Sequence, residues 1–343
     1  MFKKLLIIFS ILILSFFVLF FFWGSAAVVP DTDYAKKTVF RVDAAYSVPD
    51  TFSLMTYNIG YLSGMTNNRP VERSKTLFDN NLSAINTLFK EGKADVVLFQ
   101  EIDFDSKRSF NTNQYKAIAQ GVGYSYGACV VNWDKRYVPF PYWPIKTHFG
   151  RILSGQALLS QYPIYSNERL VLPKPQSNTF IYNAFYLDRL AQLVWIGNHE
   201  DSLLIINVHF EAWDIKTREK QARIVLEIFD KYAENYPVIL AGDFNCTSPY
   251  RQGFENEKTI QLILNHSHIS AVVDSVDYVN SPNSYYTFDS ESPRGKIDYI
   301  FYNHKYLTCV GAQVLHPQSF ISDHLPLQAF FIRRPDSLKA KNR

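Results

Sequence analysis

Hydrophobic residues fall into one long unbroken run near the amino end and many short runs after it. Residues Leu5 to Trp23 carry no charge, and only Ser10 and Ser15 among them are polar. A helix in a globular core shows a polar face, and this run has none. A run of about 18 or more apolar residues is long enough to cross a bilayer. The pattern therefore predicts a transmembrane helix over residues 5–23.

Two lysines, Lys3 and Lys4, precede this run and set its orientation. Positive residues stay on the cytoplasmic side, which places residues 24–343 on the outer side of the membrane. A cleaved signal peptide has a shorter apolar stretch of ~7–15 residues, so the length favours an uncleaved single-pass anchor. Small residues after the run leave cleavage near Ala27 open, and a cleaved chain would be secreted.

After the anchor, short strand-like and helix-like segments alternate. Residues 24–50 show little periodicity and are expected to form a juxtamembrane linker, followed by one domain over 51–333. Helices are expected over 72–91 and 215–236, from leucine and phenylalanine at helical spacing in the first. Strands are expected over 52–59, 94–99, 155–160, 185–196, 203–209, 237–243, 296–302 and 308–315. Strands outnumber helices and several are joined by short turns, which predicts an α/β fold with two packed mixed or antiparallel sheets flanked by helices.

An aromatic stretch rich in proline runs from Trp133 to Phe149. Its other rings are Tyr137, Phe140, Tyr142 and Trp143, and prolines stand at 139, 141 and 144. Prolines this dense prevent regular structure, so a loop is expected. Such a loop either packs its rings on the core or presents them to a substrate or a membrane. Both interpretations stay open at this point.

The charge distribution excludes one class of protein. The chain of 343 residues has 35 basic and 32 acidic side chains, a net charge of +3. The excess comes from Lys3, Lys4 and a basic tail at 334–343 with its neighbouring Arg333, because positions 31–332 hold 28 basic and 31 acidic residues. Proteins that coat nucleic acid need a concentrated positive surface, which this body lacks. The three cysteines are too few for a disulfide framework and too widely spaced for a zinc motif.

Polar side chains recur where the expected strands end. Carboxylates, amides and imidazoles that converge at one cleft suit a hard cation such as Mg²⁺, which prefers oxygen ligands. Each residue alone also has an ordinary structural interpretation, such as a turn residue, a strand-end cap or a buried core histidine. The candidates are Asn58, Glu101, His209, Asp243, Asn245, Asp298, Asp323 and His324.

The order and context of these residues resemble the endonuclease/exonuclease/phosphatase superfamily, which includes deoxyribonuclease I, neutral sphingomyelinases and inositol polyphosphate 5-phosphatases. The similarity covers about residues 52–332, and its most specific motifs are Gly242-Asp-Phe-Asn245 and Ser322-Asp-His324. Weaker motifs are Thr56-Tyr-Asn-Ile59, Phe99-Gln-Glu101, Asn207-Val-His209 and Ile297-Asp298. The resemblance implies a four-layer α/β sandwich and metal-assisted hydrolysis of a phosphoester by water.

The resemblance also implies a role for each matching residue. Glu101 would be the principal Mg²⁺ ligand with Asn58 beside it, Mn²⁺ being the alternative ion. Asp243 would orient or deprotonate the attacking water, and Asn245 would hold the water or a phosphate oxygen.

The remaining roles concern the histidines and the phosphate. His324 would face the phosphate with Asp298 orienting its imidazole, and Asp323 would contact the metal or assist. His209 would donate a hydrogen bond to the phosphate and protonate the leaving group. Arg151 is the first candidate for phosphate contact, with Arg189 and Lys296 beside it and a structural role open for each.

The substrate stays open among several phosphoesters. Abasic-site endonucleases of the superfamily carry a tyrosine where His209 stands, and an outer location argues against genomic DNA repair. The leading expectation is a phosphodiesterase acting on nucleic acid. The alternatives are a sphingomyelinase-like phospholipid phosphodiesterase, an inositol-phosphate phosphatase and, in another class, a non-catalytic surface binding module. No protein partner is expected.

Overall fold

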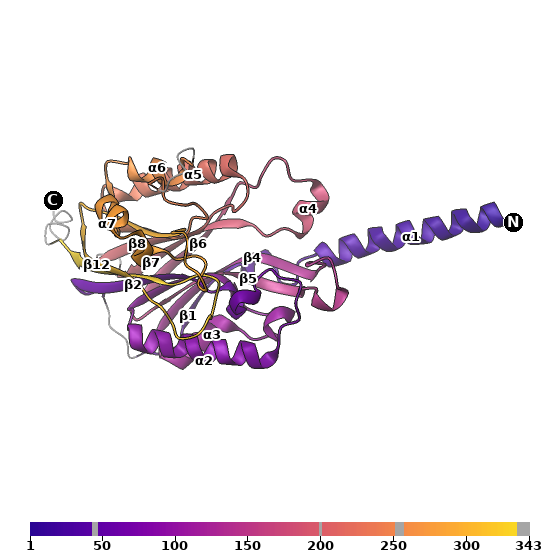
Figure 1. The fold of residues 1–343 in the computed structure, drawn as a ribbon, viewed down its shortest axis with the longest axis horizontal. Helices are drawn as coiled ribbons and strands as arrows, with labels where there is room; N and C mark the ends of the chain where they lie inside the picture. Colours follow the sequence, from indigo (N-terminus) through magenta and orange to yellow (C-terminus); the bar gives the residue numbers. More distant parts are fainter. Residues whose placement is uncertain (43–46, 199–200, 251–256, 335–343) are drawn as a thin grey trace.

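The computed structural model describes residues 1–42, 47–198, 201–250 and 257–334, so the basic tail beyond Arg334 lies outside the described residues. A two-sheet body carries one projecting helix, α1 (Phe2–Ser25), which is exposed over almost its whole length (Figure 1). This helix is long and apolar enough to cross a membrane, near the amino end of the chain. These properties fit a membrane anchor and a signal peptide alike.

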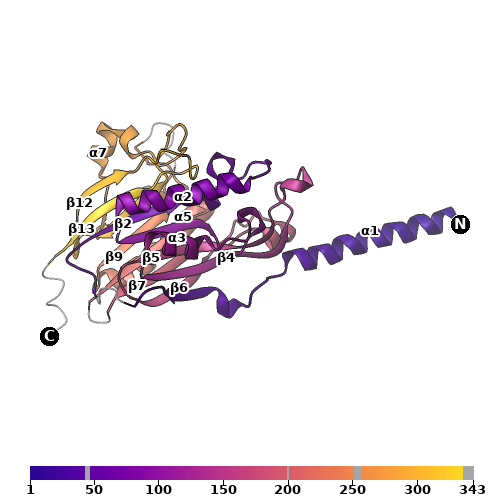
Figure 2. The same ribbon diagram turned by 90° about the horizontal axis from the view of Figure 1, so that it is seen from below.

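The first sheet has seven strands, and helices cover its outer face. β2 and β3 run parallel at its centre, and the other neighbours are antiparallel. Helices α2 (Lys75–Gly92) and α3 (Gln114–Val122) pack against it (Figure 2). In spatial order the strands are β1 (Ala35–Val39), β4 (Tyr126–Val138), β5 (Gly150–Ser160), β3 (Val96–Asp103), β2 (Thr51–Asn58), β13 (Leu327–Arg333) and β12 (Leu307–Val314).

The second sheet has six strands and packs against the first. β8 and β9 run parallel, and helices α5 (Ile215–Ala233) and α6 (Thr259–Leu264) cover its outer face (Figure 1). Two short helices, α4 (Phe180–Phe185) and α7 (Ser275–Asn280), lie in connections. The strand order is β10 (Ile269–Ala271), β11 (Asp298–Asn303), β9 (Val238–Asp243), β8 (Ser202–His209), β7 (Arg189–Gly197) and β6 (Ile164–Leu172).

The expected α/β sandwich of two mixed sheets flanked by helices is therefore confirmed. Side chains alternate along each strand, so one face of a strand enters the core between the sheets and the other meets a helix layer. In β8, for example, Ile205 lies in the core between the sheets and Ile206 in the cluster with α5. Burial on both faces explains why this strand is a continuous apolar run.

Two sequence-based expectations need correction in detail. The segment 24–50 is not only a linker, because β1 lies within it and pairs with β4 at the sheet edge. The side chains of β1 are mostly exposed and include two lysines, so no alternating apolar pattern marked it. The aromatic stretch is also shorter as a loop than expected, because its first residues, through Val138, belong to β4.

Candidate active site

Strand pairing brings the polar strand ends together. In the first sheet, Asn58 ends β2 and is paired with Gln100 of the parallel strand β3, the residue before Glu101. In the second sheet, Asp243 at the end of β9 is paired with both His209 and Asp298. The carboxyl ends of parallel strands lie at the same edge of a sheet, so both sheets deliver their polar residues to one side.

Most of the predicted site residues line a cavity of about 1210 Å³, slightly larger than usual for a small-molecule site. Six of the eight predicted site residues line it, namely Glu101, His209, Asp243, Asn245, Asp323 and His324. Ten aromatic side chains also line it, namely Tyr61, Trp133, Phe140, Tyr142, Phe149, Tyr182, Phe185, Tyr186, Trp213 and Phe288.

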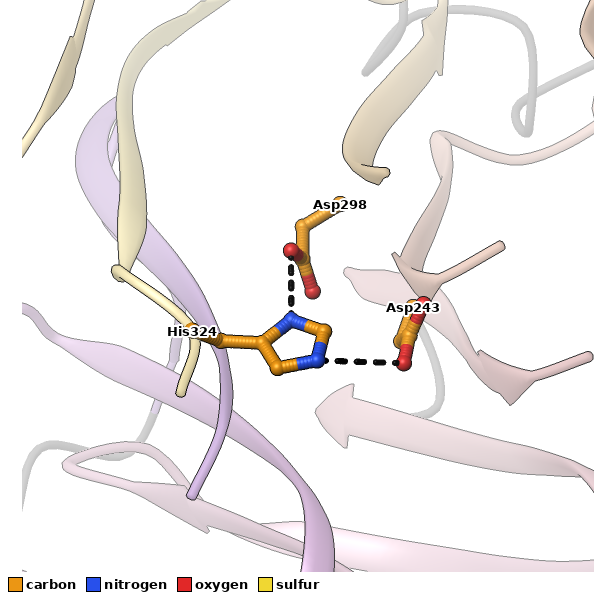
Figure 3. A group of neighbouring side chains, drawn as sticks. All are labelled: Asp243, Asp298 and His324. Atoms are coloured by element: carbon orange, nitrogen blue, oxygen red, sulfur yellow. Dashed lines mark hydrogen bonds and ion pairs between the residues drawn. The ribbon is translucent and has the colours of Figure 1, made fainter. Parts of the chain in front are cut away.

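His324 stands between two buried carboxylates (Figure 3). Its Nδ1 lies 2.9 Å from Asp298 Oδ2, and its Nε2 lies 3.8 Å from Asp243 Oδ2. Burial alone lowers the pKa of an imidazole, but the charges of Asp298 and Asp243 outweigh it and raise the pKa of His324 well above its usual value. The raised pKa favours the protonated ring, in which Nδ1–H donates to Asp298.

Asp243 is held by two donors and has an altered acidity. The side-chain amide of Asn58 donates to its Oδ2 at 2.9 Å, and the backbone N–H of Asn245 donates to its Oδ1 at 2.8 Å. Burial raises the pKa of Asp243 to about 7, although the positive His324 opposes this shift. A carboxylate with a pKa near neutrality is suited to accept a proton from water.

Local backbone features direct two motif residues. Glu101 has a φ of 51°, and the pairing of β3 with β5 shifts register between Phe99 and Ile102. Such a bulge turns a side chain out of the regular alternation, here into the cavity. At Gly242 a Cβ would lie 2.0 Å from the carbonyl oxygen of Val208, so only glycine permits this approach of β9 to β8.

Glu101 and Asp323 form an acidic pair on the cavity floor. The amide of Asn67 lies 2.9 Å from Glu101 Oε2 and 3.4 Å from Asp323 Oδ1. Burial and the nearby Asp323 raise the pKa of Glu101. Among the described residues no lysine or arginine forms an ion pair with either carboxylate. The oxygen-rich, uncompensated pair therefore fits a divalent cation such as Mg²⁺.

A second possible metal site is the group of Asp243, Asp298 and His324, whose ligand atoms lie within 4.8 Å of one another. Coordination through Nδ1 would require His324 to lose the proton that it shares with Asp298. The raised pKa of His324 opposes that loss. The acidic pair of Glu101 and Asp323 faces no such competition.

The environment of His209 differs from the role expected for it. Arg189 Nη1 lies 2.7 Å from His209 Nε2, and a guanidinium only donates, so Nε2 is an acceptor here. Burial and the positive Arg189 lower the pKa of His209 well below its usual value. A neutral ring with Nε2 accepting cannot donate from that atom to a phosphate. The cation at this position is Arg189, which lines the cavity and was only a secondary candidate in the sequence.

The structure does not bring the other two basic candidates to the cavity. Arg151 is half-exposed and pairs with Asp105. Lys296 is buried, donates to the backbone carbonyl of Asp298 and lies 3.9 Å from the centre of the Tyr299 ring. Neither side chain lines the cavity.

A two-sheet α/β sandwich with carboxylates and histidines at the carboxyl ends of its central strands defines a class of phosphoester hydrolases. The model of the Endonuclease/Exonuclease/phosphatase family matches residues 55–324, and the chain belongs to this family of metal-dependent phosphoesterases. No curated protein sequence matches the chain.

Solved structures show the same fold at low identity. An endonuclease/exonuclease/phosphatase from Beutenbergia cavernae aligns with a TM-score of 0.58 at 18% identity, over 84% of this chain and 76% of that one. The human Nocturnin catalytic domain with bound sulfate gives 0.56 at 16% identity, over 90% and 100%. D. rerio TDP2 with a single-strand DNA product gives 0.57 at 14% identity, over 82% and 99%.

Proposed function

We propose that the chain is a membrane-anchored enzyme, facing the outside, that hydrolyses a phosphodiester by metal-assisted attack of water. One observation carries this proposal. Two groups of side chains meet at the same cavity. One is His324 between Asp298 and Asp243, and the other is the acidic pair of Glu101 and Asp323. A proton acceptor, a buried cation and a cation-binding pair are the groups that phosphoester hydrolysis needs.

Glu101 would hold the metal, with Asn58 and Asp323 as further ligands. Bound Mg²⁺, or Mn²⁺ as the alternative, supplies positive charge against the negative charge that builds on the phosphoryl oxygens. Asn58 has a second task, because its Nδ2 fixes the orientation of Asp243 while its Oδ1 accepts from Gly60 N at 3.0 Å.

The chain's own groups would move the proton and steady the phosphate. Asp243 takes a proton from the attacking water while the water oxygen bonds to phosphorus and the bond from phosphorus to the leaving oxygen breaks. The leaving oxygen takes a proton from solvent, and Asn245 holds the attacking water or a phosphate oxygen. His324, kept positive by Asp298, donates to a phosphoryl oxygen from Nε2. Arg189 adds a second fixed positive charge on the cavity wall.

The test uses bis(p-nitrophenyl) phosphate with the full-length protein, with and without EDTA. We expect EDTA to abolish release of p-nitrophenol and Asp243→Asn to lower turnover by about 10²- to 10⁴-fold. Glu101→Gln should raise the Mg²⁺ concentration needed for half-maximal rate, whereas Arg151→Gln, outside the cavity, should change nothing. Turnover that EDTA does not change would contradict the metal-assisted mechanism. No turnover on this ester, DNA, RNA, sphingomyelin or inositol phosphates would favour the binding module.

The residues that line the cavity bear on the choice of substrate class. The sequence favours nucleic acid, and the TDP2 relative contains single-strand DNA. However, Arg189 and Arg294 are the only lysine or arginine residues among the described residues that line the cavity. Grooves for single-stranded nucleic acid follow the backbone with many positive charges. The aromatic walls favour a phosphodiester with a large apolar part.

A further inference from the structure

Exposed apolar side chains stand beside the mouth of the cavity. Tyr142, Trp143 and Ile145 belong to the loop between β4 and β5, and Phe180 and Ile181 belong to α4. They are exposed to 71%, 74%, 60%, 75% and 65%, respectively. These five residues are called the rim below. Exposed large apolar side chains gathered at one place mark an interaction surface.

The rim is continuous with the end of α1. The ring of Phe21 lies 5.5 Å from that of Phe180 and 5.7 Å from that of Phe185, and Phe20 lies 5.7 Å from Tyr137. α4 and the loop after β4 lie at the end of the body from which α1 projects (Figure 1, Figure 2).

These contacts fix the depth of the rim relative to a membrane. Phe21 lies within the apolar run, four residues before Ser25, which is about 6 Å along a helix. If α1 crosses the bilayer, its partner Phe180 therefore lies at the level of the lipid headgroups. Aromatic side chains concentrate at that level because one end of each can be apolar and the other wet.

The joint between α1 and the body is held by hydrogen bonds. Lys135 Nζ donates to the carbonyl of Ser25, and Arg136 N donates to the carbonyl of Ala26, both at 3.0 Å. The backbone N–H groups of Val28 and Val29 donate to Asp134 at 2.7 and 3.0 Å. The helix thus leaves the body in a defined direction, with the rim beside it.

The rim also leads into the catalytic cavity. Tyr142 and Ile181 line the same cavity as Asp243 and His324. A lipid in the outer leaflet can reach the cavity floor along apolar side chains without crossing open water.

We infer that the rim docks on the outer surface of the bilayer and that the substrate is a phosphodiester of a membrane lipid. The choice of substrate rests on the proposed catalytic activity, and the docking rests on the proposed membrane anchor but not on the catalytic activity. The basic side chain next to the rim, Lys146, forms an ion pair with Glu72 at 3.2 Å, which leaves little free positive charge there for a nucleic acid.

Docking is tested by fluorescence of the full-length protein in phosphatidylcholine vesicles whose acyl chains carry bromine. Trp143→Phe should remove an emission component that brominated lipid quenches at least twofold relative to ordinary lipid. The matched control, Trp195→Phe, removes a buried ring packed on Tyr232 and Tyr236, and that component should be unquenched. If the Trp143 component is also unquenched, docking is wrong whatever the enzyme hydrolyses.

The substrate is tested with vesicles of phosphatidylcholine, phosphatidylethanolamine, phosphatidylglycerol and sphingomyelin. The double variant W143S/F180S changes rim residues that do not line the cavity, and V276S/V279S changes exposed residues on α7, away from α1. We expect W143S/F180S to release phosphorylated headgroups or lipid phosphate at least tenfold more slowly, with bis(p-nitrophenyl) phosphate turnover within twofold of normal. V276S/V279S should leave both rates unchanged.

One outcome would overturn the lipid substrate: hydrolysis of bis(p-nitrophenyl) phosphate and single-stranded DNA by the unaltered protein with no product from any vesicle lipid. Two outcomes would overturn the role of the rim: an equal loss of both rates in W143S/F180S, or no loss of either. Absence of turnover on bis(p-nitrophenyl) phosphate as well would instead contradict the proposed catalytic function.

Discussion

At the scale of single residues, burial decides the charge of the site. The sequence identifies His209 and His324 as two histidines of one site, but it does not separate them. In the structure burial and the positive Arg189 lower the pKa of His209, whereas the charges of Asp298 and Asp243 raise the pKa of His324. The partners come from strands distant in sequence, so the two opposite protonation states follow from tertiary contacts alone.

The Asp298–His324 hydrogen bond gives the first residue-scale prediction. Asp298→Asn removes a negative charge beside the imidazole, so the pKa of His324 should fall. Turnover should fall by about 10- to 100-fold, as is usual when the partner of a functional histidine is removed. An NMR titration of the histidine ring protons measures the pKa directly. An unchanged pKa of His324 in Asp298→Asn would show that the charge of Asp298 does not act on the imidazole. Asp298→Glu keeps a carboxylate at this position, so it should retain part of the raised pKa of His324.

Lys296 gives the second prediction, which concerns stability. Burial lowers the pKa of Lys296 to about 7, against an unfolded value of about 10.4. Between these values the unfolded chain binds a proton that the folded chain does not, so stability rises with pH across this window. Lys296→Met should remove that slope and raise stability at pH 7 by an amount on the order of a few kcal/mol. Urea unfolding from pH 6 to pH 10 gives the free energy of unfolding of both proteins. If the free energy changes with pH equally in both, the lowered pKa of Lys296 is wrong.

At the scale of elements, apolar runs located the central strands well but did not show how the sheets are joined. β8 was expected over 203–209 and spans Ser202–His209. Its Asn207 was a motif residue without a role. In the structure it lies between the sheets, accepts from Gln100 at 2.7 Å and donates to Gln192 and to backbone carbonyls of both Phe99 and Ala157. Periodicity gives no sign of a buried polar group that joins two sheets.

This network gives the element-scale prediction. Asn207→Ala leaves several buried polar groups without partners, so the free energy of unfolding should fall by about 2–4 kcal/mol. Turnover should fall too, because Glu101 and His209 adjoin the network. Asn265→Ala, an exposed change, should stay within about 0.5 kcal/mol of the unaltered protein. Chemical denaturation measures the free energy of unfolding of both variants. If Asn207→Ala loses no more than Asn265→Ala, water takes the place of the Asn207 amide and the network does not stabilise the fold.

At the scale of the whole molecule, the end of the apolar helix α1 lies close to the mouth of the cavity. The sequence placed a transmembrane helix at one end and catalytic residues far along the chain, with no relation between them. The fold brings the end of α1 against β4 and α4, next to the cavity mouth. The aromatic stretch from Trp133 to Phe149 both packs on the core and presents rings to the outside, because Phe149 is buried and Trp143 is exposed.

The whole-molecule prediction concerns topology. We expect the full-length protein to stay with membranes after carbonate extraction, because about 19 apolar residues anchor it. Protease added from outside should reach a tag placed after Arg343 but not one placed before Met1. Amino-terminal sequencing decides between anchor and signal: a chain that begins near Val28 and floats free of membranes would show that the leader is cleaved.

The sequence by itself determined the layered α/β class, the family and the identities of the polar residues, because apolar runs and short motifs are local properties of a chain. Only the tertiary structure decided the charge of each histidine, the place of Arg189 on the cavity wall and the position of the rim beside α1. These depend on which groups burial and strand pairing bring together, and no spacing along the chain specifies that. The same physical reason separates Arg151, which stays outside the cavity, from Arg189, which faces it.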